Sequence, residues 1–187
     1  PYKNTKEIIL KKSKSLYRNL NSKIVEELER ISQSAIFSNK DSRKTSHILD
    51  SSINLTVTSP PFLNIVRYAD DNWLRCWFND IDVSEVEKKI SLCRDVGTWS
   101  DMMGAVFDEL YRVTVSGGWV AFEVGEVNNG KVKLDEYVVP LGIKSGFTCA
   151  GVMVNSQDFT KTSNIWGVNN MKTGTNTNRI VLFNKSK

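Results

Sequence analysis

Residues 53–62 read INLTVTSPPF, and this stretch decides how the rest of the chain is interpreted. Apolar and polar residues alternate up to Val57, and several of them are β-branched, which predicts a strand. Pro60 and Pro61 cannot donate a backbone hydrogen bond, so they end the strand. We therefore expect a strand that leads into a loop made of a serine, two prolines and an aromatic ring.

Expected helices and strands alternate on both sides of this stretch. Between residues 5 and 32, apolar residues recur at the three-and-four spacing of an amphipathic helix or a helical pair. Other helices are expected at 84–93, where Ser84 and Glu87 have the spacing of a capping box, and at 99–113 and 134–145. Other strands are expected at 35–38, 119–124, 147–154 and 178–184. This alternation predicts an α/β layered fold with a largely parallel sheet.

Length and composition predict one soluble globular domain. The chain has 187 residues, of which 40% are hydrophobic and 25% are charged, enough for a sizeable core. Because there is no repeat and no linker, we expect residues 1–187 to form a single domain, with a helical segment at 1–33 and an α/β portion at 34–187. No apolar run approaches the length of a membrane span and the lysine-rich start is no signal peptide, so a cytoplasmic location is expected.

The net charge of +4 is unevenly distributed. Residues 1–50 hold 11 Lys and Arg against 6 Asp and Glu, residues 159–187 hold 5 against none, and the middle holds 9 against 15. Basic ends permit a polyanionic partner, although solvated faces explain them equally well. Three cysteines without a CxxC pair and a single histidine, His47, argue against disulfides, a zinc site and most histidine-based triads, so no metal is expected.

The loop at Ser59 has the chemistry to hold the exocyclic amine of a nucleobase. Ligands of α/β sheets bind beyond the carboxyl ends of the strands, where this loop lies. The lone pair of the amine is delocalised into the base, so attack on a methyl donor needs acceptors that hold the two N–H groups. The Ser59 hydroxyl and the Pro60 carbonyl can accept them, and Phe62 can stack on a base flipped out of the duplex. The alternative is that the prolines merely end a strand and that Phe62 belongs to the core.

Several stretches resemble the amino-methylating DNA methyltransferases. The run DSSINLTVTSPPFLN at 50–64 resembles their fourth motif, (S/D/N)-P-P-(Y/F) after a strand. DELYRV at 108–113, SGGWVAF at 116–122 and Gly146-Phe147 resemble the helix, turn and strands that follow it. The match covers about residues 36–184 and rests mainly on TSPPF with the Gly-Gly strand at the right distance. Serine in the first place resembles the cytosine-N4 branch more than the adenine-N6 branch.

This resemblance implies a partial class I, Rossmann-like methyltransferase fold with a mostly parallel sheet and helices on both faces. It implies transfer of a methyl group from S-adenosyl-L-methionine to a flipped base of DNA, without a metal. The catalytic residues implied are Ser59, Pro60, Pro61 and Phe62. Asp41, which is equally well a turn aspartate, is implied to contact the donor with Thr58 and Ser59. Candidate DNA contacts, which a solvated loop explains equally well, are Lys161, Thr162, Ser163, Asn164, Asn178 and Arg179.

The resemblance fails at the donor-binding loop. These enzymes carry a glycine-rich F-x-G-x-G loop after the first strand, and nothing in this sequence has that spacing and context. Three explanations stay open: an upstream part of the same gene, a separate subunit that supplies the donor-binding half, or a remnant without catalysis. The initial proline and the helix before the strand at 35–38 favour the first two.

Other functions also stay open. The main competitor is a non-catalytic DNA-binding or interaction module, and RNA or a protein amide are alternative acceptors. Residues 68–73, YADDNW, either line the base pocket or face DNA, or form a packed aromatic segment, which we favour for Trp73 and Trp77.

Overall fold

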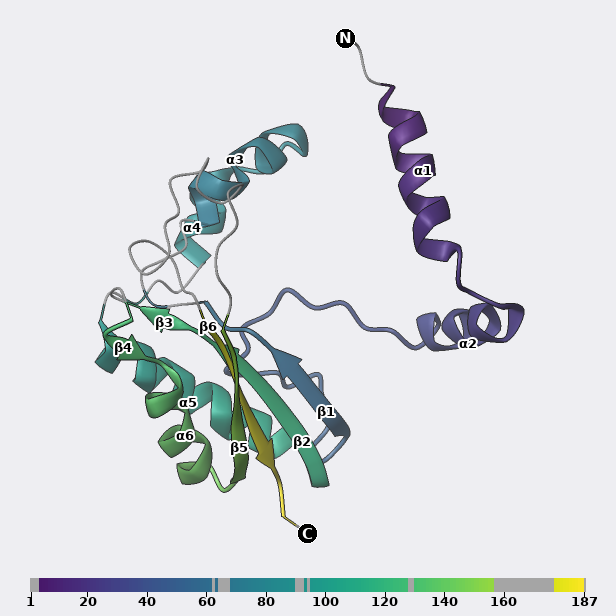
Figure 1. The fold of residues 1–187 in the computed structure, drawn as a ribbon. Coiled ribbons are helices and arrows are strands. Elements are labelled where there is room, and N and C mark those ends of the chain that lie inside the picture. Colours follow the sequence, from purple (N-terminus) through teal and green to yellow (C-terminus); the bar gives the residue numbers. More distant parts are fainter. Residues whose placement is uncertain are drawn as a thin grey trace. The chain divides into compact units, whose positions relative to one another are not determined.

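The computed structural model describes residues 4–61, 63, 68–89, 93, 95–127, 130–156 and 177–186. The chain divides into two compact units, Pro1–Asn39 and Lys40–Lys187. The first unit is helical, and the second contains the sheet together with the loop at Ser59 (Figure 1).

Two helices form the first unit, which confirms the predicted helical pair. α1 is Thr5–Tyr17 and α2 is Ser22–Ser32. Asn4 and Asn21 cap them, because each side-chain oxygen accepts a hydrogen bond from the backbone N–H three residues later, at 3.3 and 2.9 Å. Such a bond satisfies one of the donors that the first turn of a helix leaves unpaired.

The strand predicted at residues 35–38 was wrong. Residues 35–39 have no regular structure, and the side chains of Ile36 and Phe37 are 78% and 97% exposed. A strand needs a neighbour for its backbone N–H and C=O groups. Among the described residues no strand pairs with this segment, so its apolar composition alone did not produce a strand.

Four strands build the main sheet of the second unit. They are β1 (Ile53–Thr58), β2 (Thr114–Val124), β6 (Thr177–Asn184) and β5 (Thr148–Ser156), in that spatial order (Figure 1). β1 pairs parallel with β2, whereas β6 pairs antiparallel with both β2 and β5. Three of the four strands therefore share one direction and β6 alone runs back between two of them. The α/β class is confirmed, and the pairing is mixed where a largely parallel sheet was expected, because β6 returns into the gap between β2 and β5.

A short hairpin and two helices follow the strands closely. β3 (Glu126–Val127) and β4 (Val132–Lys133) pair antiparallel directly after β2. α5 (Val96–Val113) and α6 (Asp135–Lys144) cover one face of the sheet (Figure 1). α5 begins three residues before its predicted start because Asp95 caps it, with Oδ1 accepting from the Thr98 N–H at 2.8 Å.

The core lies between these two helices and the sheet. Val120 and Phe122 of β2 and Phe183 of β6 are fully buried on the helix side. Phe107 of α5 meets two of these rings, with centroids 4.7 Å from Phe122 and 5.2 Å from Phe183. Aromatic pairs at such spacing add to the burial of apolar surface. α5 and α6 supply the main helix contacts of the sheet among the described residues.

Gly117 and Gly118 lie inside β2, because this strand begins at Thr114, five residues before its predicted start. α5 already ends at Val113, and Gly117 has φ +79°, which favours glycine. A Cβ on Gly118 would lie 2.7 Å from Thr114 Cγ2 and 2.9 Å from the Val115 carbonyl oxygen. The two glycines therefore allow the chain to pass close to Thr114 and Val115 near the start of β2.

Arg112 ties the segment before β1 to α5. Its Nη1 donates to the Ile48 carbonyl at 3.0 Å, and its Nη2 donates to the Thr45 carbonyl at 3.2 Å and to Glu109 at 2.7 Å. Asp50 accepts a further bond from the same guanidinium. The Arg112 guanidinium thus binds two backbone carbonyls and a carboxylate of the segment before β1, together with Glu109 of α5. These bonds fix where the chain enters β1.

α3 (Tyr68–Phe78) and α4 (Val83–Lys89) follow the loop at Ser59. The predicted capping role of Ser84 was wrong, because Asp82 Oδ1 accepts from the Ser84 N–H at 2.8 Å and Ser84 lies inside the helix. The packed state expected for Trp73 and Trp77 was also wrong, since they are 58% and 72% exposed. None of the described helices combines the length and apolar character needed to cross a membrane.

Candidate functional site

The loop that leaves β1 lies at the carboxyl edge of the sheet. Thr58 is the last residue of β1 and is in register with Phe122 of β2. Ser59 is exposed, whereas Pro60 and Pro61 are half-buried. The structure thus places the predicted serine at the end of a strand with its side chain open to solvent, where it can meet a ligand.

Trp99 of α5 holds this loop in place through a hydrogen bond. Its Nε1 donates a hydrogen bond to the Pro61 carbonyl oxygen at 3.0 Å, and the ring is only 1% exposed. Leu63, just beyond the prolines, is 4% exposed and belongs to the same core cluster as Trp99 and Cys93. A buried indole N–H needs an acceptor, so this bond fixes the direction of the Pro61 carbonyl and limits the freedom of the loop.

Sequence reasoning missed this role of Trp99. The residue was expected only as the first residue of a helix, and it lies 38 positions from its acceptor. A periodic pattern shows which side of a helix is apolar, but it does not show which carbonyl a buried indole will reach. The only available signal was a large aromatic with a polar handle at the start of an apolar helix.

Asp41 lies on the loop before β1 and is engaged by Arg43. Its carboxylate accepts bonds from the Arg43 backbone N–H at 2.9 Å and from Arg43 Nη2 at 2.6 Å. The side-chain hydrogen bond from Arg43 lowers the pKa of Asp41 to about 2, so the group stays ionised near neutral pH. Burial raises the pKa of the Cys93 thiol, the negative charge of Asp95 raises it further, and the positive charge of Arg43 acts against both.

Arg179 belongs to a nearly buried ion-pair cluster with Glu126 and Asp135. Its Nη2 lies 2.7 Å from Glu126 Oε1 and its Nη1 lies 3.2 Å from Asp135 Oδ2. The three side chains are between 11% and 16% exposed. Burial alone lowers the pKa of Arg179, but the hydrogen bond to Glu126 and the two negative charges raise it above its usual value. The guanidinium thus joins β6, the β3–β4 hairpin and the start of α6.

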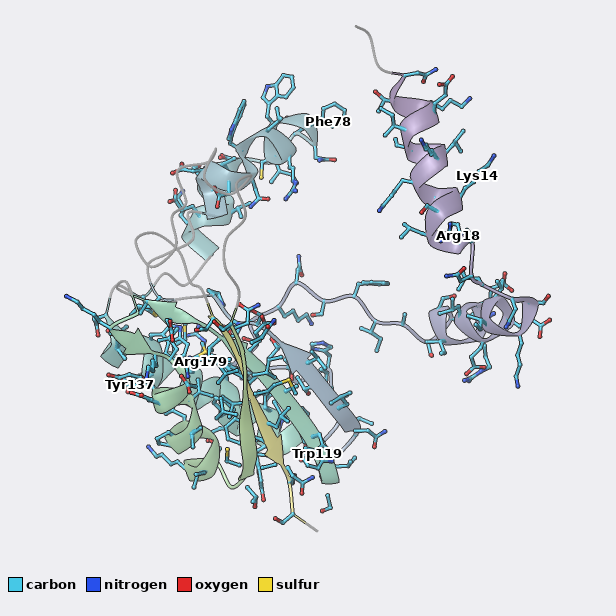
Figure 2. The ribbon with its side chains drawn as sticks, viewed as in Figure 1. Lys14, Arg18, Phe78, Trp119, Tyr137 and Arg179 are labelled. Atoms are coloured by element: carbon cyan, nitrogen blue, oxygen red, sulfur yellow. The ribbon has the colours of Figure 1, made fainter. Side chains whose placement is uncertain are left out.

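This cluster lies at the same edge of the sheet as Ser59. Arg179 is in register with Val124 of β2, two residues beyond the partner of Thr58 (Figure 2). Sequence reasoning did not foresee the two carboxylates beside Arg179. A DNA phosphate at this guanidinium would also meet their negative charges, so the phosphate contact expected for Arg179 stays a prediction.

Several other predicted residues lie outside the described part of the chain. Phe62 is one of them, and so are Lys161, Thr162, Ser163 and Asn164. Their predicted roles in base stacking and in phosphate contact stay predictions. Within the described residues, the structure brings together Thr58, Ser59, Pro60 and Pro61 with the Trp99 anchor.

The chemistry available at this loop is hydrogen-bond acceptance next to a fixed backbone. A serine hydroxyl and a proline carbonyl can each accept an N–H group. Among the described residues, no three His, Cys, Asp or Glu side chains gather closely enough to hold a metal ion. A groove of about 300 Å³ between α5 and α6, lined by Asp101, Asp108 and Lys144 among others, does not include the loop.

Comparison with known proteins shows likeness in structure only. No family model and no curated protein matches the sequence. The PvuII DNA methyltransferase, named as cytosine-N4-specific, is 15% identical with a TM-score of 0.51 over 79% of this chain and 48% of its own. A protein of Thermus thermophilus named as a DNA modification methylase, solved with S-adenosyl-L-methionine, is 18% identical with a TM-score of 0.49 over 79% and 51%. A Methanosarcina mazei protein named as a SAM-dependent methyltransferase is 12% identical with a TM-score of 0.42 over 90% and 80%.

The likeness to the PvuII enzyme shows a shared fold. At 15% identity it shows nothing finer. The chain spans about half the length of the first two of these solved structures.

Proposed function

We propose that this chain is the catalytic portion of an S-adenosyl-L-methionine-dependent DNA methyltransferase. It transfers a methyl group to the exocyclic amine of a flipped base. We favour N4 of cytosine as the target, and N6 of adenine is the alternative. The observation that carries the proposal is the exposed Ser59, on a Pro-Pro loop fixed by Trp99, at the carboxyl end of a parallel strand. The fold shared with a cytosine-N4-specific enzyme supports the same choice.

Ser59 and Pro60 hold the amine in this proposal. The Ser59 hydroxyl oxygen accepts one N–H and the Pro60 carbonyl accepts the other, which turns the nitrogen lone pair out of conjugation with the base. Trp99 contributes indirectly, because it fixes the next carbonyl along the chain and so holds the loop in one geometry. Phe62 stacks on the extruded base.

The residues present fit the methyl donor only in part. The donor, when bound, supplies a methyl carbon made electrophilic by a positively charged sulfur. Thr58 and Ser59 end β1 at the edge where a ligand of an α/β sheet binds. The Asp41 carboxylate is ionised and exposed, but it already holds Arg43. Because the sequence has no glycine-rich loop, we propose that the remaining donor contacts come from a further polypeptide segment, on the same or another chain.

DNA is the proposed partner of the basic ends of the chain. Lys161, Thr162, Ser163, Asn164 and Arg179 are the proposed contacts, and Arg179 has to keep or exchange its carboxylate partners when DNA binds. We also propose that the protein acts in the cytoplasm.

The test of this proposal is a kinetic comparison at Ser59. The full chain is assayed with the polypeptide encoded beside it, labelled S-adenosyl-L-methionine and DNA of random sequence. Ser59→Ala is expected to lower kcat by about 10- to 100-fold, because it removes an acceptor that acts in the transition state. Ser59→Asn keeps an acceptor and should retain most of the activity.

Ser52→Ala serves as the matched control, since Ser52 is an exposed serine whose hydroxyl donates to the Leu49 carbonyl before β1. Equal turnover in wild type and Ser59→Ala contradicts the proposal. Salt-sensitive DNA binding without any methyl transfer points instead to a non-catalytic DNA-binding module.

A further inference from the structure

The face of the sheet opposite α5 and α6 carries exposed apolar side chains. Leu55 and Val57 of β1 are 59% and 74% exposed. Their register partners on β2 are Trp119, which is 43% exposed, and Ala121. Figure 2 labels Trp119 on β2. We call the surface made by Leu55, Val57, Trp119, Ala121 and Met153 the open face.

The open face continues across the sheet to β5. Ala121 is in register with Leu182 of β6, and Ile180 of β6 is in register with Met153 of β5, which is 56% exposed. Because side chains in register share one face of a sheet, the apolar residues form a band over all four strands. Two polar residues share this face, Glu123 as the partner of Ile180 and Asn184 as the partner of Trp119. Contiguous apolar surface of this kind marks an interaction site.

In β1 the polar side chains face the core and the apolar side chains face away from it, the reverse of the pattern in β2. Thr56 and Thr58 are in register with the fully buried Val120 and Phe122, so the threonines point toward α5 and α6. The leucine and the valine of the same strand point to the open face. A strand covered on one face only places its apolar residues on the covered face, so this pattern indicates that β1 is built to be covered on the open face as well.

β1 also lies at an edge of the sheet. Its one strand neighbour among the described residues is β2, and that pairing is parallel. Parallel strands occur almost only in sheets with both faces covered, and a free edge offers a row of unpaired backbone groups to another strand. The free edge and the open face meet at β1, so one partner segment can cover both.

We propose that β1 is a docking strand for a further α/β segment, which adds a strand parallel to β1 and lays an apolar helix on the open face. This inference rests on the proposed function, since that segment is the half that carries the remaining donor contacts. Chain length supports this occupant, because a solved structure that shares the fold is longer than this chain and only 48% of it is matched. Nucleic acid does not fit, because the open face is apolar.

A second copy of this chain fits less well. Two copies related by a two-fold axis perpendicular to the sheet bring their β1 strands together antiparallel. The parallel pairing that β1 makes with β2 is instead extended by a strand that reaches it through a helical crossover.

The test uses the full chain and, as probe, the polypeptide encoded directly beside it on either side, over a length equal to this chain. The two are purified and mixed without donor or DNA, and binding is followed by sedimentation velocity and calorimetry. A one-to-one complex is expected. Leu55→Lys or Val57→Lys should weaken it by about tenfold or more, because a lysine brings a charge into the covered face.

Leu74→Lys is the matched control, since Leu74 of α3 is 55% exposed against 59% for Leu55. It should change binding by less than about twofold. The lysine variants keep the thermal unfolding midpoint of the wild type, because their positions are exposed in this chain. As a readout without mutation, hydrogen exchange at the β1 amides should slow when the probe binds.

Three results overturn the inference. They are a probe that does not bind or encodes no strand–helix unit, binding that both lysine variants keep, and a wild-type dimer of this chain that the lysine variants separate. The inference and the proposed function fail separately. A complex that transfers no methyl group leaves the docking strand in place and removes the function, whereas methylation by this chain without any partner removes the docking strand and leaves the function.

Discussion

Trp99 gives the loop at Ser59 its fixed shape through one hydrogen bond. The bond joins the buried indole N–H to the Pro61 carbonyl at 3.0 Å. Trp99→Phe keeps an aromatic ring in the core and removes only the donor. We expect a loss of about 1 kcal/mol in the free energy of unfolding and a fall of about tenfold in kcat, larger than the stability change implies.

Urea denaturation and steady-state methyl transfer measure the two effects. Trp73→Phe is the matched control, because Trp73 is 58% exposed on α3 and should tolerate the change in both assays. If Trp99→Phe lowers stability but leaves kcat unchanged, Trp99 is only a core residue.

Glu109 makes the stability of the fold depend on pH. The side-chain hydrogen bond from Arg112, joined by bonds from Thr45, lowers the pKa of Glu109 from its usual 4.5 to about 2. Because the folded-state pKa is lower than the unfolded one, the stabilisation is complete above about pH 4.5 and is lost as the pH falls toward 2.

Glu109→Gln should therefore be less stable than wild type by about 2 kcal/mol at pH 7. The difference should shrink between pH 5 and pH 2, as followed by urea denaturation at each pH. A difference that stays constant over this range shows that the carboxylate charge contributes nothing.

At the scale of elements, two glycines in helices distinguish the effect of close packing on stability from the effect of helix propensity. A Cβ on Gly142 of α6 would overlap the ring of Phe183, which is fully buried. A Cβ on Gly104 of α5 would meet only Leu141 Cδ2, at 3.7 Å. Gly142→Ala should destabilise by about 1–3 kcal/mol through overpacking, whereas Gly104→Ala should be neutral or stabilise by up to about 1 kcal/mol.

Thermal and urea unfolding of the two variants provide the check. Opposite signs are expected from the same chemical change in two helices of one unit. Equal effects at both positions contradict the close contact between α6 and β6.

Periodicity and turn chemistry predicted most of these elements. The alternation before the prolines predicted β1, and the helices expected at 99–113 and 134–145 match α5 and α6 within a few residues. The helical span expected at 5–32 contains α1 and α2, but the break between them was not predicted. The strand expected at residues 35–38 failed, because composition does not show whether a partner strand exists. The prediction that Trp73 and Trp77 are packed failed for a similar reason, because composition does not show whether an aromatic side chain is buried or lies on the surface.

The candidate site was predictable where it is local in sequence. Ser59 and the two prolines follow a strand, and the loop is where the strand ends. The Trp99 anchor and the carboxylates around Arg179 were not predictable, because each joins residues from separate elements. Ion pairs and buried hydrogen bonds between distant positions depend on tertiary packing, which a single sequence does not display.

At the scale of the whole molecule, α5 and α6 cover one face of the sheet, and the other face carries apolar side chains that are exposed in the described part of the chain. The covered face holds the core and positions the loop at Ser59. In our proposal, a second half docks on the open face and on the edge of β1, which has no strand neighbour among the residues that the structure describes. Taken together, the two proposals assign to this chain the half of an α/β fold that holds the base.

The most direct test of the central claim is the identity of the methylated nucleoside. DNA treated with the complex and labelled donor is digested, and the nucleosides are separated by mass and retention time. The expected result is label on the exocyclic nitrogen of cytosine or adenine, with an initial rate about 10- to 100-fold lower for Ser59→Ala and largely retained for Ser59→Asn. Label on a ring carbon, or label on nitrogen that survives Ser59→Ala undiminished, contradicts it.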